Sequence, residues 1–107
     1  MTTWIIPEGI TEITEQYIQN NMPYGTTQIE IPESVHSIGN SAFECCRSLK
    51  SIVIPESVQS IGDQSFYGCT SLESIKIPEG VQSIDANAFY NCMSLKTIEI
   101  PSSVQSI

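Results

Sequence analysis

The chain repeats one pattern of 23 residues, and this period limits the fold more than any other feature of the sequence. Each copy opens with an Ile-Pro dipeptide, and successive dipeptides are 25, 23, 23 and 23 residues apart. Full copies cover residues 31–53, 54–76 and 77–99, and a further copy begins at residue 100. A unit this short cannot bury its own apolar side chains, so successive units are expected to stack and to bury them together.

Each unit contains the pattern L-x-x-I-x-I, as in Leu49, Ile52 and Ile54. Apolar residues at this alternating spacing predict a short strand with one buried face. Val35 and Ile38, together with their equivalents in later units, predict a second short extended segment. Stacked units are expected to bury all of these residues in continuous ladders.

The segments between the predicted strands are expected to turn the chain. A small residue followed by phenylalanine, as in Ser65-Phe66, predicts one helical or 3₁₀ turn that points the ring inward. Proline directly after a strand has no N–H, so it ends the pairing. Gly39 and Gly62 are predicted to supply the positive φ of a bend, with Asp85 as the substitute in the next unit. The predicted fold is an α/β solenoid, mostly β, with right-handed coils.

The stretch IPESVQSIGDQSFYGCTSLESI, residues 54–75, resembles the BspA-like, or Treponema-type, leucine-rich repeat family at nearly every defining column. The resemblance covers residues 31–107 well and residues 6–30 loosely. It implies a curved solenoid with parallel strands on the concave face. It also implies a bacterial or protist surface adhesin, or another protein that acts by binding.

The first unit departs from the pattern, as expected of a cap on the core of a solenoid. Residues 1–30 are predicted to be a degenerate N-terminal capping repeat, with Trp4 and an amphipathic turn of helix around Tyr17 and Ile18. Residues 31–107 are predicted to form three full repeats and a partial fourth in the same continuous domain.

The C-terminal end lacks an equivalent cap. Ile100, Val104 and Ile107 occupy core columns that no later unit covers. An uncovered apolar end with an unpaired strand edge invites pairing with another chain. Two interpretations stay open: the chain is a piece of a longer array, or two copies form a homodimer end to end.

The cysteines are interpreted as core residues. Cys46, Cys69 and Cys92 share one column and predict an inward ladder of reduced thiols, because free cysteine packs as a small hydrophobic residue. Cys45 lies beside the ladder and is the expected exposed thiol. Zinc sites favour C-x-x-C or Cys/His pairs, which the sequence does not contain. No metal site is predicted from the cysteines.

Catalysis is not predicted. His36, the single histidine, falls in a column that otherwise holds Gln59, Gln82 and Gln105, which predicts an exposed side chain. The sequence has no Walker loop, no G-x-G-x-x-G, no H-E-x-x-H and no G-x-S-x-G. We therefore expect no catalytic residue, no cofactor and no enzymatic activity.

One acidic column leaves two hypotheses open. Glu8, Glu33, Glu56 and Glu79 each follow the proline of an Ile-Pro dipeptide, and Ser102 ends the column. The row is either solvated, with each side chain splayed outward, or bridged by a hard cation such as calcium.

Charge and hydropathy restrict the partners. The formal net charge is -8, which disfavours binding to nucleic acid or to an anionic membrane. No stretch approaches the roughly 20 apolar residues of a membrane span, so no insertion is expected. The start MTTWIIPEGI has no secretory signal pattern. Unpaired thiols and this start favour the cytoplasm, whereas the family resemblance implies the cell surface.

The concave face is the predicted site for a protein partner. Residues between the buried isoleucines of a strand point to solvent there. These residues form two columns: Gln28, Ser51, Ser74 and Thr97 in one, and Glu30, Val53, Lys76 and Glu99 in the other. The second column changes character at every step, either to form a specific surface or because nothing constrains it. The sequence predicts a non-catalytic protein-interaction module, with adhesion as the refinement that the resemblance implies. The alternative is a structural unit that self-assembles through its uncapped end.

Overall fold

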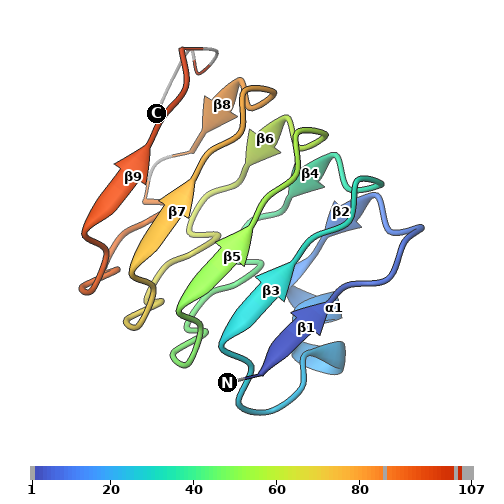
Figure 1. Cartoon of the computed structure of the whole chain (residues 1–107), viewed down its shortest axis with the longest axis vertical. Coiled ribbons are helices and arrows are strands. Elements are labelled where there is room, and N and C mark those ends of the chain that lie inside the picture. The colour runs from blue at the N-terminus through green and yellow to red at the C-terminus, as the bar shows by residue number, and fades with distance from the viewer. Residues whose placement is uncertain (1, 86, 103, 105–107) are drawn as a thin grey trace.

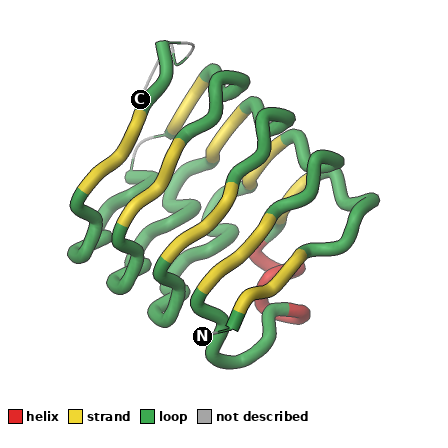
Figure 2. Tube along the Cα trace, viewed as in Figure 1, coloured by secondary structure: helices red, strands yellow, loops and turns green. Residues whose placement is uncertain are grey.

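The computed structural model describes residues 2–85, 87–102 and 104. The chain winds into a solenoid of stacked coils that follow one another in the order of the sequence (Figure 1). Each of the first four coils contains two strands, and the first coil also contains a helix. Figure 2 shows the strands in yellow, joined by green loops. One side, named here the long-strand face, is formed by β1 (Thr3–Ile5), β3 (Gln28–Glu30), β5 (Ser51–Val53), β7 (Ser74–Lys76) and β9 (Thr97–Glu99). The second side is formed by β2 (Glu12–Ile13), β4 (Ser37–Ile38), β6 (Ser60–Ile61) and β8 (Ser83–Ile84).

All paired strands are parallel, and the register repeats the sequence period. Ile29 of β3 pairs with Ile52 of β5, and Ile75 of β7 pairs with Ile98 of β9. The order β2-β4-β6-β8 is continuous, whereas the long-strand face consists of a three-stranded sheet, β1-β3-β5, and a two-stranded sheet, β7-β9. This architecture confirms the predicted mostly-β solenoid.

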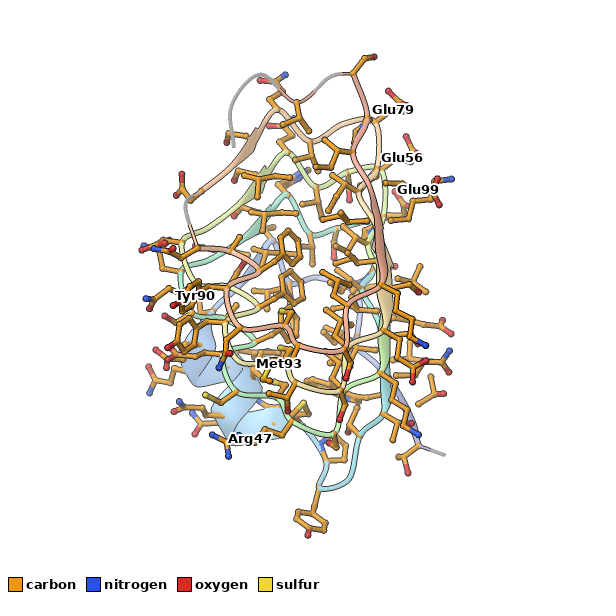
Figure 3. All side chains as sticks on the ribbon, turned by 90° about the vertical axis from the view of Figure 1, so that its left-hand side faces the viewer. Arg47, Glu56, Glu79, Tyr90, Met93 and Glu99 are labelled. Atoms are coloured by element: carbon orange, nitrogen blue, oxygen red, sulfur yellow. The ribbon has the colours of Figure 1, made fainter. Side chains whose placement is uncertain are left out.

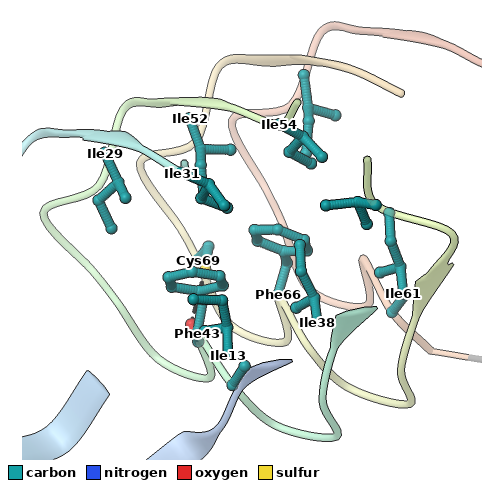
Figure 4. Packing of buried hydrophobic residues seen from close by; sticks show 14 of the residues in the cluster. Ile13, Ile29, Ile31, Ile38, Phe43, Ile52, Ile54, Ile61, Phe66 and Cys69 are labelled. Carbon is teal, nitrogen blue, oxygen red and sulfur yellow. Dashed lines mark hydrogen bonds between the residues drawn. The ribbon is translucent and has the colours of Figure 1, made fainter. Parts of the chain in front are cut away.

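Identical core residues stack from coil to coil because of this register. The rings of Phe43, Phe66 and Phe89 are parallel, with 5.3 Å between the centroids of each neighbouring pair. Isoleucines from both strand stacks, among them Ile29, Ile38 and Ile61, surround the phenylalanines (Figure 4). The core is therefore one continuous column of side chains rather than a set of separate clusters.

The turns that carry these phenylalanines are not helical, and the prediction of helical or 3₁₀ turns is wrong at this point. The chain instead makes successive hydrogen-bonded turns, interrupted by the positive φ of Ser41 (59°) and Cys45 (59°). The Phe43 N–H donates to the Ser65 carbonyl of the next coil at 2.7 Å, and Cys45 N–H donates to Tyr67 at 2.7 Å. These left-handed residues let alternate N–H groups bond to the next coil, which a helical turn would prevent.

Gly39 and Gly62 do not adopt positive φ, and neither does Asp85, so that prediction is also wrong. The role of the two glycines is close approach. The Gly62 N–H donates to the carbonyl of Ile38 at 2.9 Å, and a Cβ on Gly62 would lie 2.8 Å from the backbone nitrogen of Asn40. The positive φ values of this turn fall on Gln64 (56°) and Gly68 (73°), two and six residues later.

The first coil contains the helix α1 (Glu15–Asn21). Its N-cap is Thr14, whose side chain accepts a hydrogen bond from the Tyr17 N–H at 3.1 Å. Ile18 is buried, and the Tyr17 ring stacks on Trp4 with 6.1 Å between centroids. The expected helical turn is confirmed, and the capping role of residues 1–30 stays a prediction.

Replacing Ser65 with alanine is expected to stabilise the fold by about 1 kcal/mol. The Ser65 hydroxyl is fully buried and has no hydrogen-bond partner, whereas the same column holds alanine at Ala42 and Ala88. Removing the unpaired oxygen relieves its desolvation cost. Urea unfolding followed by circular dichroism measures the effect, with the half-exposed Ser60→Ala as the control. A less stable Ser65→Ala variant would mean that the hydroxyl has a hydrogen-bond partner.

Candidate interaction surface

The long-strand face brings the predicted partner-binding residues together. The parallel register places Glu30 beside Val53, and Lys76 beside Glu99. All four are exposed, because they flank the buried isoleucines at the centre of each strand. The exposed fraction of Val53 is 55 %. Along this single column the exposed side chain is therefore acidic, then apolar, then basic and then acidic again.

The second predicted column lies beside the first on the same face. Gln28, Ser51 and Ser74 occupy equivalent positions at the start of their strands, and Thr97 continues their backbone register. The side chain of Thr97 lies outside the described part of the structure. Gln28 accepts a hydrogen bond at its Oε1 from the Thr3 hydroxyl at 2.9 Å. The predicted residues therefore share one face, and partner binding by them stays a prediction.

Two hollows at the edge of the long-strand face were not predicted. The first has a volume of about 320 Å³ and lies between the corners that follow β1 and β3. The second, of about 330 Å³, lies between the corners that follow β5 and β7, where the sheet is interrupted. The repeat pattern did not predict either hollow, because each combines strand residues with glutamates of the acidic column, which the pattern treats separately. The first hollow also contains Ile5, which lies in the degenerate first unit.

The acidic column runs along this edge. Glu8, Glu33, Glu56 and Glu79 are all exposed. Figure 3 shows Glu56 and Glu79 pointing outward on the same side as Glu99, with Arg47 and Tyr90 on the opposite side. Among the described residues, no three His, Cys, Asp or Glu side chains are grouped closely enough to hold a metal ion.

The cysteine ladder is confirmed within the described coils. Cys46 and Cys69 are buried, Cys92 is half-buried, Cys45 is exposed, and all four are free thiols. The Cys69 thiol donates to the Phe43 carbonyl at 3.1 Å. The pKa of Cys69 lies above its ordinary value, because the neighbouring Cys46 side chain and burial both disfavour the Cys69 thiolate. Burial likewise raises the pKa of Cys92. These thiols act as core residues.

The turn side of the solenoid carries a third hollow, of about 480 Å³. Its walls are residues 22–25, which follow α1, and residues 45–48 of the next coil. Tyr24 is fully exposed beside it, and Arg47 is the only cation among its lining residues.

The His36 side chain is exposed, as predicted. The backbone N–H of His36 donates to the Thr11 carbonyl at 2.7 Å.

The last coil exposes residues that are buried in earlier coils. Ile98 and Ile100 are 36 % and 43 % exposed, whereas the equivalent Ile52 and Ile54 are 6 % and 7 % exposed. Val104 is half-buried, and its N–H donates to the carbonyl of Pro101 at 3.2 Å. Ile107, the third residue of the predicted self-association surface, lies outside the described residues.

Stacked parallel coils with an invariant core and a changing outer column define a solenoid repeat protein. The family model of the BspA-type leucine-rich repeat region matches residues 1–107 in six copies. The chain belongs to this family. Comparison with curated proteins gives no significant match.

Solved structures with the same fold come from several bacteria. A leucine-rich repeat protein of T. pallidum is 24 % identical with a TM-score of 0.72, over 92 % of this chain and 58 % of that one. A leucine-rich cell surface protein of Faecalibacterium prausnitzii is 28 % identical with a TM-score of 0.62, over 97 % and 37 %. A leucine-rich repeat protein of Bacteroides ovatus is 26 % identical with a TM-score of 0.70, over 99 % and 33 %. The chain thus covers at most 58 % of the length of these three proteins.

Within the described part of the chain, no helix has both the length and the apolar character that crossing a bilayer requires.

Proposed function

We propose that this chain is a non-catalytic protein-interaction module that binds a protein partner through its long-strand face. The supporting observation is the contrast between two columns of the same strands. The central column holds isoleucine at Ile29, Ile52 and Ile75, all buried. The outer column beside it reads Glu30, Val53 and Lys76, all exposed. A scaffold of this kind varies its surface without disturbing its core.

Adhesion is the refinement that we propose for this binding function. It is supported by the family to which the chain belongs, and by its likeness to a Faecalibacterium prausnitzii protein described as a cell surface protein. A cell-surface position would place the long-strand face against proteins outside the cell. Labelling of intact cells with an antibody to the chain tests this position.

Binding by this face alone is expected to be weak or multivalent. The proposed columns contain no aromatic residue, and aromatic anchors contribute much of the energy of tight interfaces. Several copies of a weak site on one surface can still hold a partner firmly, because each further contact forms at high effective concentration.

The combined change Glu30→Lys, Lys76→Glu and Glu99→Lys is expected to reduce partner capture about tenfold or more. Captured proteins are quantified by mass spectrometry, from lysate and from intact cells, and each partner is then titrated in pure form. The control, Glu12→Lys, Arg47→Glu and Asp85→Lys, makes the same change in net charge away from the long-strand face. Equal loss in both variants, or loss in the control alone, would contradict binding through this face.

A second candidate function is favoured by the exposed Ile98 and Ile100 of the last coil. Under this proposal the chain is a structural unit that associates with a second copy through its C-terminal end. The mass of the chain in solution, measured by light scattering over a concentration series, tests it.

A further inference from the structure

The first hollow of the long-strand face combines an apolar floor with an acidic rim. It is lined by Ile5, Ile6, Pro7, Glu8, Glu30, Ile31, Pro32 and Glu33. Ile6 and Ile31 are buried and form part of the core, whereas Ile5 is 67 % exposed. An isoleucine this exposed, next to two prolines, offers apolar contact area that no described part of the chain covers.

Every charged residue that lines this hollow is a glutamate. Glu8, Glu30 and Glu33 are exposed, and within the described part of the chain their carboxylates form no hydrogen bond or ion pair. The hollow therefore has three carboxylates and no base to balance them. Unbalanced charge beside an apolar surface favours a ligand that carries positive charge on an apolar stem.

The second hollow provides an internal comparison. It occupies the same columns two coils further on and is lined by Ile52, Val53, Ile54, Glu56, Lys76 and Pro78. Here Lys76 replaces the glutamate that the outer column has at Glu30, so one base balances Glu56. Both hollows lie at equivalent corners, although β1 and β3 beside the first are paired and β5 and β7 beside the second are not. Only the first hollow is uniformly acidic.

We propose that the first hollow binds an arginine or lysine side chain of an extended segment of a protein partner. This proposal rests on the proposed function of the long-strand face and adds the chemistry of the partner. The methylene stem of the basic side chain would lie on Ile5 and the prolines, as such stems do on apolar surfaces. Its charged head would bind the carboxylates of the rim. A guanidinium group offers several donors in a planar fork, which suits carboxylates that are spread apart.

The spacing of the two hollows adds a second requirement for the partner. They lie two coils apart, about 10 Å at the usual separation of neighbouring strands. Three residues of a segment in the extended polyproline II conformation span about 9 Å, and side chains three positions apart point to the same side. A segment that runs along the solenoid would thus place its basic residue in the first hollow and a residue three positions away beside Val53 and Lys76. An apolar or acidic side chain suits that second position.

A random peptide library displayed on phage tests the proposal with the complete 107-residue chain as bait. The wild-type chain is expected to enrich peptides with an arginine or lysine at one position, and binding of selected peptides should weaken as salt is added. In Glu30→Gln/Glu33→Gln this enrichment should disappear, and the Kd of a selected peptide should rise about tenfold or more. The matched control, Glu79→Gln/Glu99→Gln, removes one carboxylate from each of the same two columns and should bind as the wild type does.

A third variant, Ile5→Ser, changes only an exposed side chain and should weaken binding without altering the thermal unfolding curve. Basic peptides that bind wild type and Glu30→Gln/Glu33→Gln equally would overturn the proposal. Peptides without a basic residue that shift the NMR signals of Val53 and Lys76 would also overturn it, while the proposed function of the face would stand. Selected peptides that shift no signal on the long-strand face would contradict both.

Discussion

Phe66→Ala is expected to lower the free energy of unfolding by about 3–5 kcal/mol. The Phe66 ring is fully buried between Phe43 and Phe89, with 5.3 Å from its centroid to each neighbouring centroid. Truncation removes the ring itself and one contact surface of each neighbour. The cavity would lie in the middle coil, where the stacked units on both sides prevent collapse.

The loss is measured by urea unfolding, followed by circular dichroism. Phe89→Ala is the matched control, since Phe89 lies in the same column but is half-buried. Its truncation should cost less, because part of the ring already contacts solvent. Folded domains are stable by only about 5–15 kcal/mol, so the loss in Phe66→Ala should be a substantial part of the total stability. Equal losses for Phe66→Ala and Phe89→Ala would contradict a core that is continuous through the middle coil.

The chain is expected to associate at high concentration, and Ile100→Asp is expected to keep it monomeric. Ile98 and Ile100 expose apolar surface beside the outer edge of β9, which has no strand paired to it among the described residues. Such an edge is a template for pairing with another chain. A carboxylate at position 100 would have to lose its hydration when the ends meet, which opposes association.

Light scattering after size exclusion, under reducing conditions, measures this effect. Val53→Asp is the control, because Val53 is also an exposed apolar residue but lies on the long-strand face away from the end. Val104→Asp should act as Ile100→Asp does. A wild-type chain that stays monomeric at every concentration would contradict association of two copies through their C-terminal ends. Loss of association in Val53→Asp as well would place the contact on the face instead.

The fold could be predicted from the sequence because the repeat aligns equivalent residues. Once Ile52 and Ile75 are recognised as one column, parallel stacking of their strands follows from the need to bury them. The same alignment placed Cys46 and Cys69 in the core, as the structure confirms. The periodic part of the sequence therefore contains most of the information about the core.

The turns could not be predicted in the same way. Their positive φ values fall on Ser41, Gln64 and Asn87, and on Cys45, Gly68 and Asn91 in the second such column. Glycine and asparagine are known to tolerate this region, whereas serine, glutamine and cysteine give no sign of it. Hydrogen bonds to the next coil impose the conformation, and these bonds depend on the assembled stack.

The candidate site was predicted only in part. Glu30 was identified because it lies on a predicted strand, but Ile5, Glu8 and Glu33 were not combined with it. The hollow that unites them is formed by two successive corners, one of which belongs to the irregular first unit. Its chemistry depends on which charges meet across neighbouring coils, and a single-unit pattern does not contain that information.

Strand contacts in this solenoid run from each coil to the next: β3 contacts β1 and β5, and β4 contacts β2 and β6. Stability in such an array is approximately a sum of terms for single coils and for adjacent pairs. The coils are therefore regularly spaced, about 4.8 Å apart. One additional 23-residue unit between residues 40 and 41 would move the two hollows apart by one coil spacing, and would leave the residues that line each hollow together. Evolution could adjust the reach of such a surface to the length of a partner by duplicating units, without redesigning any of them.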